Sequence, residues 1–135
     1  MTALLGVGVD AVEIDRMRSA LGRTQGLAER LFTPGERTLS ASPRGHLRPG
    51  NLAGRFAAKE AVAKALGTGV RGFGFRDIEV LNDAAGKPYV RLHAGAAHAA
   101  DRLGVARVEV SITTSRALAI ANAVASGGGE GVARA

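Results

Sequence analysis

The sequence contains no cysteine and no tryptophan, and aromatic residues make up only 4% of its 135 residues. The absence of cysteine excludes disulfides, thiolate zinc sites and a cysteine nucleophile, and it is typical of a reducing compartment. Because aromatics are scarce, a core must be built from Val, Leu, Ile and Ala. Few side chains are left for stacking on bases and no nucleic-acid-binding motif is present, so we do not expect a nucleic acid as partner.

Two kinds of targeting segment are also missing. No apolar run approaches the roughly 20 residues that a membrane-spanning helix needs. The first residues, MTALLGVGVDAVEID, carry no basic segment and reach Asp10 too early for a secretory signal peptide. Together with the missing cysteines, these absences predict a soluble, cytoplasmic protein without membrane contact.

Acidic residues are in the minority, with 12 Asp and Glu against 18 Lys and Arg and a net charge of +6. A positive protein attracts phosphates or an acidic protein partner. A genome that favours arginine codons would produce the same excess, so the charge alone leaves both explanations open.

The length of 135 residues, 46% of them hydrophobic, suits one domain with a core of its own. Residues 127–135 contain four glycines, which is typical of a flexible chain end. We therefore predict a single domain over residues 1–126 and a flexible Gly-rich tail over 127–135.

The Ala-rich stretch Arg55–Gly69, RFAAKEAVAKALGTG, strongly favours a helix. With the residues before it, this stretch predicts a helix from about Asn51 to Leu66. Phe56, Glu60 and Lys64 are spaced four residues apart and therefore share one strip of the helix. An acid and a base so placed usually form a solvated salt bridge, so the pair alone does not indicate a site.

The run Leu4–Val9 alternates glycine with Leu and Val and predicts a strand that is buried on both faces. Gly6 and Gly8 indicate that another backbone or a ligand lies close to this strand. Asp10 follows at the expected carboxyl end of the strand. It is a candidate N-cap for the next helix and, alternatively, a carboxylate ligand of a metal or phosphate site.

The rest of the chain predicts further helices and then antiparallel strands. Thr33-Pro34-Gly35-Glu36 is a capping box that begins a short helix, and Ser42–Gly50 is a basic loop. The other predicted elements are helices over 13–21 and 94–103, a weakly helical 26–31, a glycine-rich passage over 67–74, and strands over 78–81, 89–92, 105–113 and 117–125. The fold class is therefore α+β, with a long central Ala-rich helix packed on a small antiparallel sheet.

Asp10 and Glu60 converge if the first strand packs beside the Ala-rich helix. Two hard oxygen ligands, with other positions left to water and phosphate, suit Mg²⁺. Nearby cations (Arg55, Lys64, and Arg44 or Arg48 from the basic loop) suit a substrate with several phosphates. No P-loop motif is present. The residues alone thus indicate a Mg²⁺-dependent enzyme that acts on phosphates.

Several segments resemble the holo-[acyl-carrier-protein] synthases, the small 4′-phosphopantetheinyl transferases. The segment Gly6–Asp10 with Glu13–Arg16 is similar to their first signature, and Leu52–Ala61 with Lys64–Gly69 is similar to their second. Comparable segments are Thr33–Glu36, Asp77–Val80, Gly86–Pro88 and Val110–Thr113. The resemblance spans roughly Leu5 to Ala125, and it implies the 4′-phosphopantetheinyl transferase-like fold.

The resemblance implies that the 4′-phosphopantetheine group of coenzyme A is transferred to a serine of an apo acyl carrier protein, releasing 3′,5′-ADP, as in fatty acid biosynthesis. It implies Mg²⁺ on Asp10 and Glu60, with Glu60 and Lys64 as catalytic residues. The residues that it assigns to coenzyme A are Arg48, Arg55, Lys64, Gly67 and Thr114.

The resemblance also implies two protein partners. In proteins of this type the first helix receives the acidic carrier protein, so Arg16 and Arg23 are expected to attract it. The family is typically a homotrimer with active sites between subunits. The sequence leaves open which carrier is served, fatty-acid, polyketide or another.

One position departs from the family pattern. A histidine usually follows the Ser-Ile segment, but this chain has Thr114, which cannot act as a base at neutral pH. His46 from the basic loop, or a water molecule, is a candidate substitute, whereas His93 and His98 are expected to be structural. The departure leaves an alternative function open, a catalytically weakened module that binds coenzyme A or the carrier protein.

Overall fold

The computed structural model describes residues 3–67 and 73–128. It confirms the α+β class: a three-stranded antiparallel sheet in the order β1-β5-β4, a two-stranded antiparallel sheet β2-β3, and helices packed on them. The strands are β1 (Ala3–Glu13), β2 (Ile78–Asn82), β3 (Pro88–Leu92), β4 (Val105–Thr114) and β5 (Leu118–Gly127). The helices are α1 (Ile14–Arg23), α2 (Leu27–Leu31), α3 (Pro34–Leu39), α4 (Pro49–Ala65), the short 3₁₀ helix η1 (Phe75–Asp77) and α5 (Ala94–Leu103).

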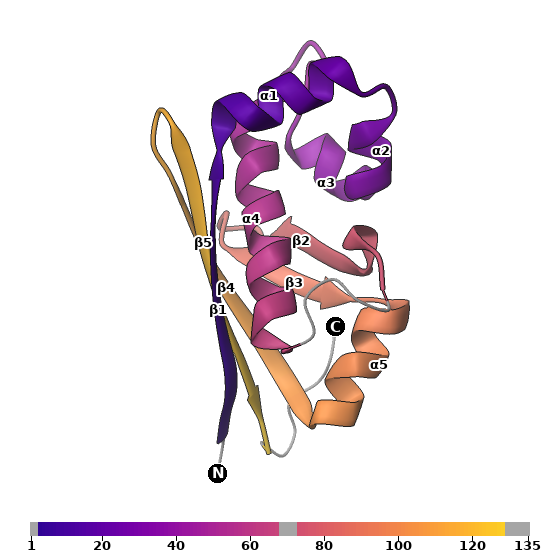
Figure 1. The fold of residues 1–135 in the computed structure, drawn as a ribbon, viewed down its shortest axis with the longest axis vertical. Helices are drawn as coiled ribbons and strands as arrows, with labels where there is room; N and C mark the ends of the chain where they lie inside the picture. The colour runs from indigo at the N-terminus through magenta and orange to yellow at the C-terminus, as the bar shows by residue number, and fades with distance from the viewer. Residues whose placement is uncertain (1–2, 68–72, 129–135) are drawn as a thin grey trace.

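Helix α4 is the centre of the molecule. It lies between the long three-stranded sheet and the β2-β3 pair, with α1, α2 and α3 gathered around its N-terminal end (Figure 1). Its alanines are buried, and those from Ala57 onward form the main core with residues from β2, β4 and β5. Pro49 stands in the first turn, where a proline is well tolerated, so the helix begins two residues before the predicted Asn51. In the described part of the chain, no helix is long and apolar enough to cross a membrane.

Strand β1 packs directly on α4 through its glycines, so of the two predicted alternatives, another backbone or a ligand, the backbone of α4 is the one observed. A Cβ atom on Gly6 would lie 1.9 Å from the Ala65 carbonyl oxygen, and a Cβ on Gly8 would lie 1.9 Å from the Ala61 carbonyl oxygen. Real Cβ atoms do not come this close, so the two glycines let strand and helix backbones touch. The contact fixes the distance between β1 and the side chains on the facing strip of α4.

The prediction that the first strand is buried on both faces was wrong. Strand β1 is the edge of its sheet, and only the glycine-bearing face is covered by α4. The opposite face exposes 63% of Val7 and 55% of Val9. The strand also runs to Glu13, which is the N-cap residue of α1. Asp10 therefore stands within the strand, and its prediction as an N-cap was wrong as well.

The other predicted elements are confirmed with small shifts of their ends. Thr33 and Glu36 form the capping box of α3, with Thr33 Oγ1 accepting from the Glu36 backbone N–H at 3.2 Å. Gly104 closes α5 in the left-handed conformation, with φ of 75°. Strand β5 extends to Gly127, one residue beyond the predicted domain limit. Residues 129–135 of the predicted tail and 68–72 of the predicted glycine passage lie outside the described residues.

Candidate active site

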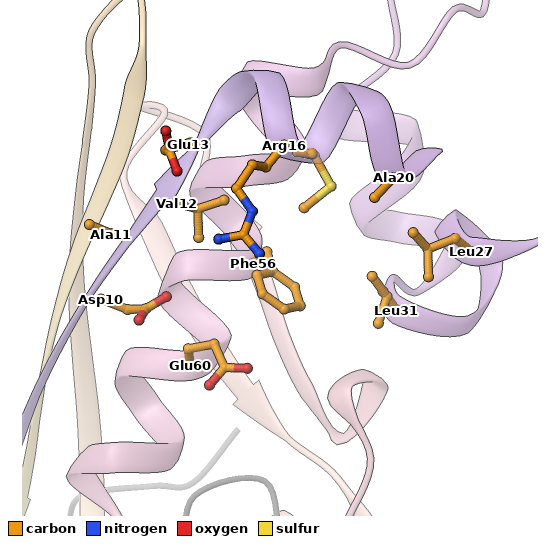
Figure 2. A pocket seen from close by; sticks show the side chains of 11 residues that line it. Asp10, Ala11, Val12, Glu13, Arg16, Ala20, Leu27, Leu31, Phe56 and Glu60 are labelled. Atoms are coloured by element: carbon orange, nitrogen blue, oxygen red, sulfur yellow. The ribbon is translucent and has the colours of Figure 1, made fainter. Parts of the chain in front are cut away.

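A pocket of about 380 Å³ opens where β1, α1, α2 and α4 meet (Figure 2). Asp10 and Glu60 lie at one end of it with their carboxylates near each other, and Arg16 extends from α1 toward the ring of Phe56. The remaining lining is mostly apolar and consists of Ala11, Val12, Glu13, Met17, Ala20, Leu27 and Leu31. The sequence prediction that Asp10 and Glu60 converge agrees with this geometry.

The repeat of side-chain directions along the strand and along the helix explains why Asp10 and Glu60 face the same pocket. In a strand alternate side chains share a face, so Asp10 lies on the same side as Gly6 and Gly8, toward α4. In a helix every fourth side chain shares a strip, so Glu60 follows Phe56 on the strip that faces the pocket. The glycine contacts bring the two elements close enough for the carboxylates to interact.

The electrostatics of the pair match its geometry. Burial raises the pKa of the Glu60 carboxyl, the negative charge of Asp10 raises it further, and the Lys64 ammonium opposes both effects. A divalent cation between the carboxylates would relieve the repulsion that raises the pKa of Glu60. Two carboxylates that leave further positions to water and phosphate oxygens suit Mg²⁺. The donor set therefore fits the ion that the sequence predicted.

Lys64 belongs to the same cluster. Its Nζ atom lies 3.3 Å from Asp10 Oδ1 and donates a 2.9 Å hydrogen bond to the Val9 carbonyl oxygen. The lysine also borders a second hollow of about 560 Å³ on the side of β1 and β5, lined by Val7, Gly8, Val9, Asn122, Ala123 and Val124. Its ammonium is thus next to the carboxylates and half-exposed to solvent.

Arg55 and Thr114, both predicted to bind coenzyme A, lie in another pocket of about 200 Å³. Gly50, Asn51, Gly54, Asn82, Gly86, Pro88 and Ile112 complete its lining. Among the described residues, none lines both this pocket and the one that holds Asp10 and Glu60. Within one chain, Arg55 and Thr114 therefore lie in one pocket, whereas Lys64 lies beside Asp10.

The guanidinium of Arg55 is occupied by the fold itself. It donates to Ser40 Oγ at 3.1 Å, to the Val80 carbonyl at 2.9 Å and to Asn82 Oδ1 at 2.7 Å. These bonds tie α4 to β2 and to the residue after α3. Arg55 therefore presents little of its charge to the pocket that it lines.

The remaining predicted residues line neither of these two pockets. Arg48 is exposed immediately before α4, and Gly67 follows the C-terminal end of α4 in the left-handed conformation with φ of 78°. Arg23 is exposed in the last turn of α1. His46, the candidate substitute for the family histidine, is exposed in the loop before α4 and lines neither pocket.

Lys59 and Glu36 form a buried ion pair that the sequence reasoning missed. Both side chains are fully buried, and Lys59 Nζ donates to Glu36 Oε1 at 2.8 Å, to the Ile78 carbonyl at 2.6 Å and to the Phe75 carbonyl at 2.9 Å. Glu36 Oε2 in turn accepts from the Val80 backbone N–H at 2.8 Å. Lys59 precedes Glu60, so this network supports the helix turn that carries the site.

One sequence signal pointed to that pair. Lys59 is a charge on the Ala-rich helix that does not share the strip of Glu60 and Lys64. A charge on the core-facing side of a helix requires a buried partner. The partner, Glu36, lies 23 residues away and was interpreted only as part of a local capping box.

Three comparisons with known proteins agree on the relatives of the chain. The family model for the 4′-phosphopantetheinyl transferase superfamily matches residues 6–121. The holo-[acyl-carrier-protein] synthase of Clostridium novyi is 47% identical over 121 residues, which cover 90% of this chain and 86% of that protein. The crystal structure of holo-ACP-synthase from Plasmodium yoelii is similar with a TM-score of 0.83 at 26% identity, covering 96% of this chain and 99% of the other. The Helicobacter pylori holo-[acyl-carrier-protein] synthase in complex with coenzyme A is similar with a TM-score of 0.76 at 28% identity, covering 88% and 98%.

Proposed function

Because the chain belongs to the 4′-phosphopantetheinyl transferase superfamily, we propose that it is a holo-[acyl-carrier-protein] synthase that uses Mg²⁺. It transfers the 4′-phosphopantetheine group of coenzyme A to a serine hydroxyl of an apo acyl carrier protein and releases 3′,5′-ADP. The observation that carries this proposal is the convergence of Asp10 and Glu60 in one pocket beside Lys64. The similar Helicobacter pylori enzyme has been solved with coenzyme A, which supports this substrate.

In the proposed reaction the serine oxygen forms a bond to the β-phosphorus of coenzyme A, and the bond from that phosphorus to the bridging oxygen breaks. Asp10 and Glu60 would hold the Mg²⁺, which supplies neutralisation of charge on the diphosphate. Lys64 offsets charge that develops on the leaving phosphate, because its ammonium lies beside the carboxylates. The departing group takes the bonding electrons and leaves as 3′,5′-ADP.

The serine proton needs an acceptor. Glu60, acting through a water molecule, is the candidate, although a carboxylate bound to a metal is a weak base. Thr114 cannot take this part, and it lines the other pocket.

A complete site requires a second copy of the chain in this proposal. The separation of Asp10 and Glu60 from Arg55 and Thr114 is consistent with an active site shared between neighbouring subunits of a homotrimer. The outer face of the long sheet is the surface available for assembly, because it exposes large apolar side chains: Leu4, Val7, Val9, Leu118 and Val124.

Helix α1 is the proposed docking surface for the acidic carrier protein. Arg16 lies at the rim of the pocket and Arg23 at the far end of the helix, both exposed. Positive charges so placed would steer an acidic partner toward the pocket. A cytoplasmic location, where carrier proteins are modified, completes the proposal.

The experiment is mass spectrometry of apo acyl carrier proteins incubated with coenzyme A, Mg²⁺ and the enzyme. The intact chain is expected to add one phosphopantetheine mass, and Glu60→Ala is expected to lower the rate at least about a hundredfold. Glu29→Gln, at an exposed residue of α2 that does not line the pocket, is the control and should keep full activity. Near-normal turnover by Glu60→Ala would overturn the metal assignment, and no mass increase across several carriers would overturn the function.

Thr114 favours one second candidate, a catalytically weakened module that binds coenzyme A or the carrier protein. Titration calorimetry that shows coenzyme A binding without turnover would support it. Restoration of turnover by Thr114→His would then identify the missing histidine as the cause.

A further inference from the structure

We propose that Lys64 exchanges partners during the reaction, pairing with Asp10 until a divalent ion binds there and then pairing with the diphosphate. This inference rests on the proposed function and deepens it. It adds that metal binding and diphosphate binding are coupled through the movement of one ammonium group.

The contacts of Lys64 show that the ammonium and a divalent ion compete for one carboxylate. Lys64 Nζ lies 3.3 Å from Asp10 Oδ1, one of the two oxygens that the Asp10 carboxylate offers to a metal. A divalent ion bound to that carboxylate repels the neighbouring ammonium. Ion binding therefore weakens the lysine contact, and the lysine contact weakens ion binding.

The exposure of Lys64 shows that its ammonium is able to move away from Asp10. Its side chain is 51% exposed and has a second acceptor in the Val9 carbonyl at 2.9 Å. Lys59, one helical turn earlier on another strip, is fully buried and donates to three acceptors. Lys59 is fixed by its surroundings, whereas the flexible stem of Lys64 can swing through solvent at little cost.

The helix determines where the released ammonium goes. Lys64 lies one turn after Glu60 on the same strip of α4, so its flexible side chain stays within reach of the carboxylates after it leaves Asp10. A diphosphate bound at the ion would supply a new negative charge within that reach. The ion thus frees the cation that the diphosphate then binds, which makes the two binding events cooperative.

The first test measures Mn²⁺ binding by calorimetry at fixed pH and ionic strength without coenzyme A. Lys64→Gln is expected to bind Mn²⁺ about three- to fivefold more tightly than the unsubstituted chain, since a partly exposed ion pair no longer competes. The matched control is Arg16→Gln, which removes a positive charge from the same pocket without removing a contact to Asp10. It should change the affinity by less than about twofold.

The second test repeats the titration with saturating coenzyme A and compares the ratio of Mn²⁺ affinities with and without it. The partner exchange predicts that this ratio is several-fold smaller in Lys64→Gln than in the unsubstituted chain. If the lysine always faced the phosphates, Lys64→Gln would lower coenzyme A affinity equally with and without the ion and would leave the ratio unchanged. An unchanged ratio, or equal Mn²⁺ affinities in Lys64→Gln and Arg16→Gln, overturns the inference.

A third variant separates this inference from the proposed function. Glu60→Gln should weaken Mn²⁺ binding at least tenfold if the ion binds at the two carboxylates. Unchanged Mn²⁺ binding in Glu60→Gln overturns the metal site itself, and the partner exchange with it. Circular dichroism of all three variants confirms that each compared protein is folded.

Discussion

The carboxylate of Glu60 is proposed to bind the metal, but its charge destabilises the folded chain when no metal is bound. Burial and the charge of Asp10 raise the pKa of its carboxyl, so the folded chain holds a proton there more tightly than the unfolded chain. Below the unfolded pKa, about 4.3, the group is protonated in both states and carries no penalty. As the pH rises through the folded pKa, the ionised group destabilises the fold. The penalty is therefore present at neutral pH.

Glu60→Gln is accordingly expected to raise the free energy of unfolding at neutral pH in buffer free of divalent ions. The gain should be roughly 0.5 kcal/mol, because the side chain is only partly buried and solvent screens the interaction. It should disappear as the pH falls below about 4. Urea unfolding of both chains at several pH values measures this difference. A stability loss at neutral pH would contradict the electrostatic account of this residue.

Lys59 and Lys64 show how differently one residue type is used on one helix. Burial lowers the pKa of Lys59, while the charge and hydrogen bond of Glu36 act in the opposite direction. Lys59 also lies over the ring of Phe32 at 5.5 Å from its centroid. Lys59 therefore stabilises the fold, whereas the half-exposed Lys64 is accessible to a substrate.

At the scale of elements, the packing of β1 on α4 decides the geometry of the site. The strand lies against the helix backbone at Gly6 and Gly8, and Asp10 follows on the same face. Because Asp10 is only two residues from Gly8, any separation of the two backbones also separates its carboxylate from Glu60.

Gly8→Ala is expected to destabilise the fold by about 3 kcal/mol or more, because its Cβ would meet the Ala61 carbonyl oxygen at 1.9 Å. The matched control is Gly22→Ala in α1, where an added Cβ meets nothing within 4 Å. The control should stabilise the chain by up to about 1 kcal/mol, since alanine favours a helix. Thermal unfolding of the two variants measures both changes. Equal melting temperatures would contradict the close approach of strand and helix.

At the scale of the whole molecule, residues 3–67 and 73–128 cover one face of the long sheet and leave the other exposed. α4 lies on the side that carries the glycines and Asp10 (Figure 1). The other side exposes apolar residues of β1 and β5. A face of this kind is typical of a surface that other copies of the chain cover. The proposed homotrimer would bury it and complete the divided site.

Val9→Lys tests the assembly, because Val9 is 55% exposed on this outer face. Sedimentation equilibrium is expected to give three chain masses for the unsubstituted protein and one for the variant, with transferase activity lost together with the assembly. Leu103→Lys at the end of α5 is the control, since Leu103 is a 47% exposed apolar residue outside the long sheet. A trimeric Val9→Lys variant would exclude this face as the interface.

Local patterns predicted the elements and part of the site. The capping box at Thr33, the Ala-rich run around Glu60 and the Gly104 helix end depend on residues within a few positions of one another, and each was confirmed in the structure. The convergence of Asp10 and Glu60 was predicted on the condition that the first strand packs beside the Ala-rich helix, and the structure shows that packing. Whether the two acids bind Mg²⁺ stays a prediction.

The sequence by itself therefore determined which segments form strands and helices. It also determined which side chains share a face of each element. Only the tertiary structure decided which faces are covered: α4 covers the glycine side of β1 and leaves Val7 and Val9 exposed. It also decided the pairing of Lys59 with Glu36, 23 residues apart, and of Lys64 with Asp10, 54 residues apart. Such contacts depend on how whole elements pack, because side-chain spacing within one element carries no information about the element opposite.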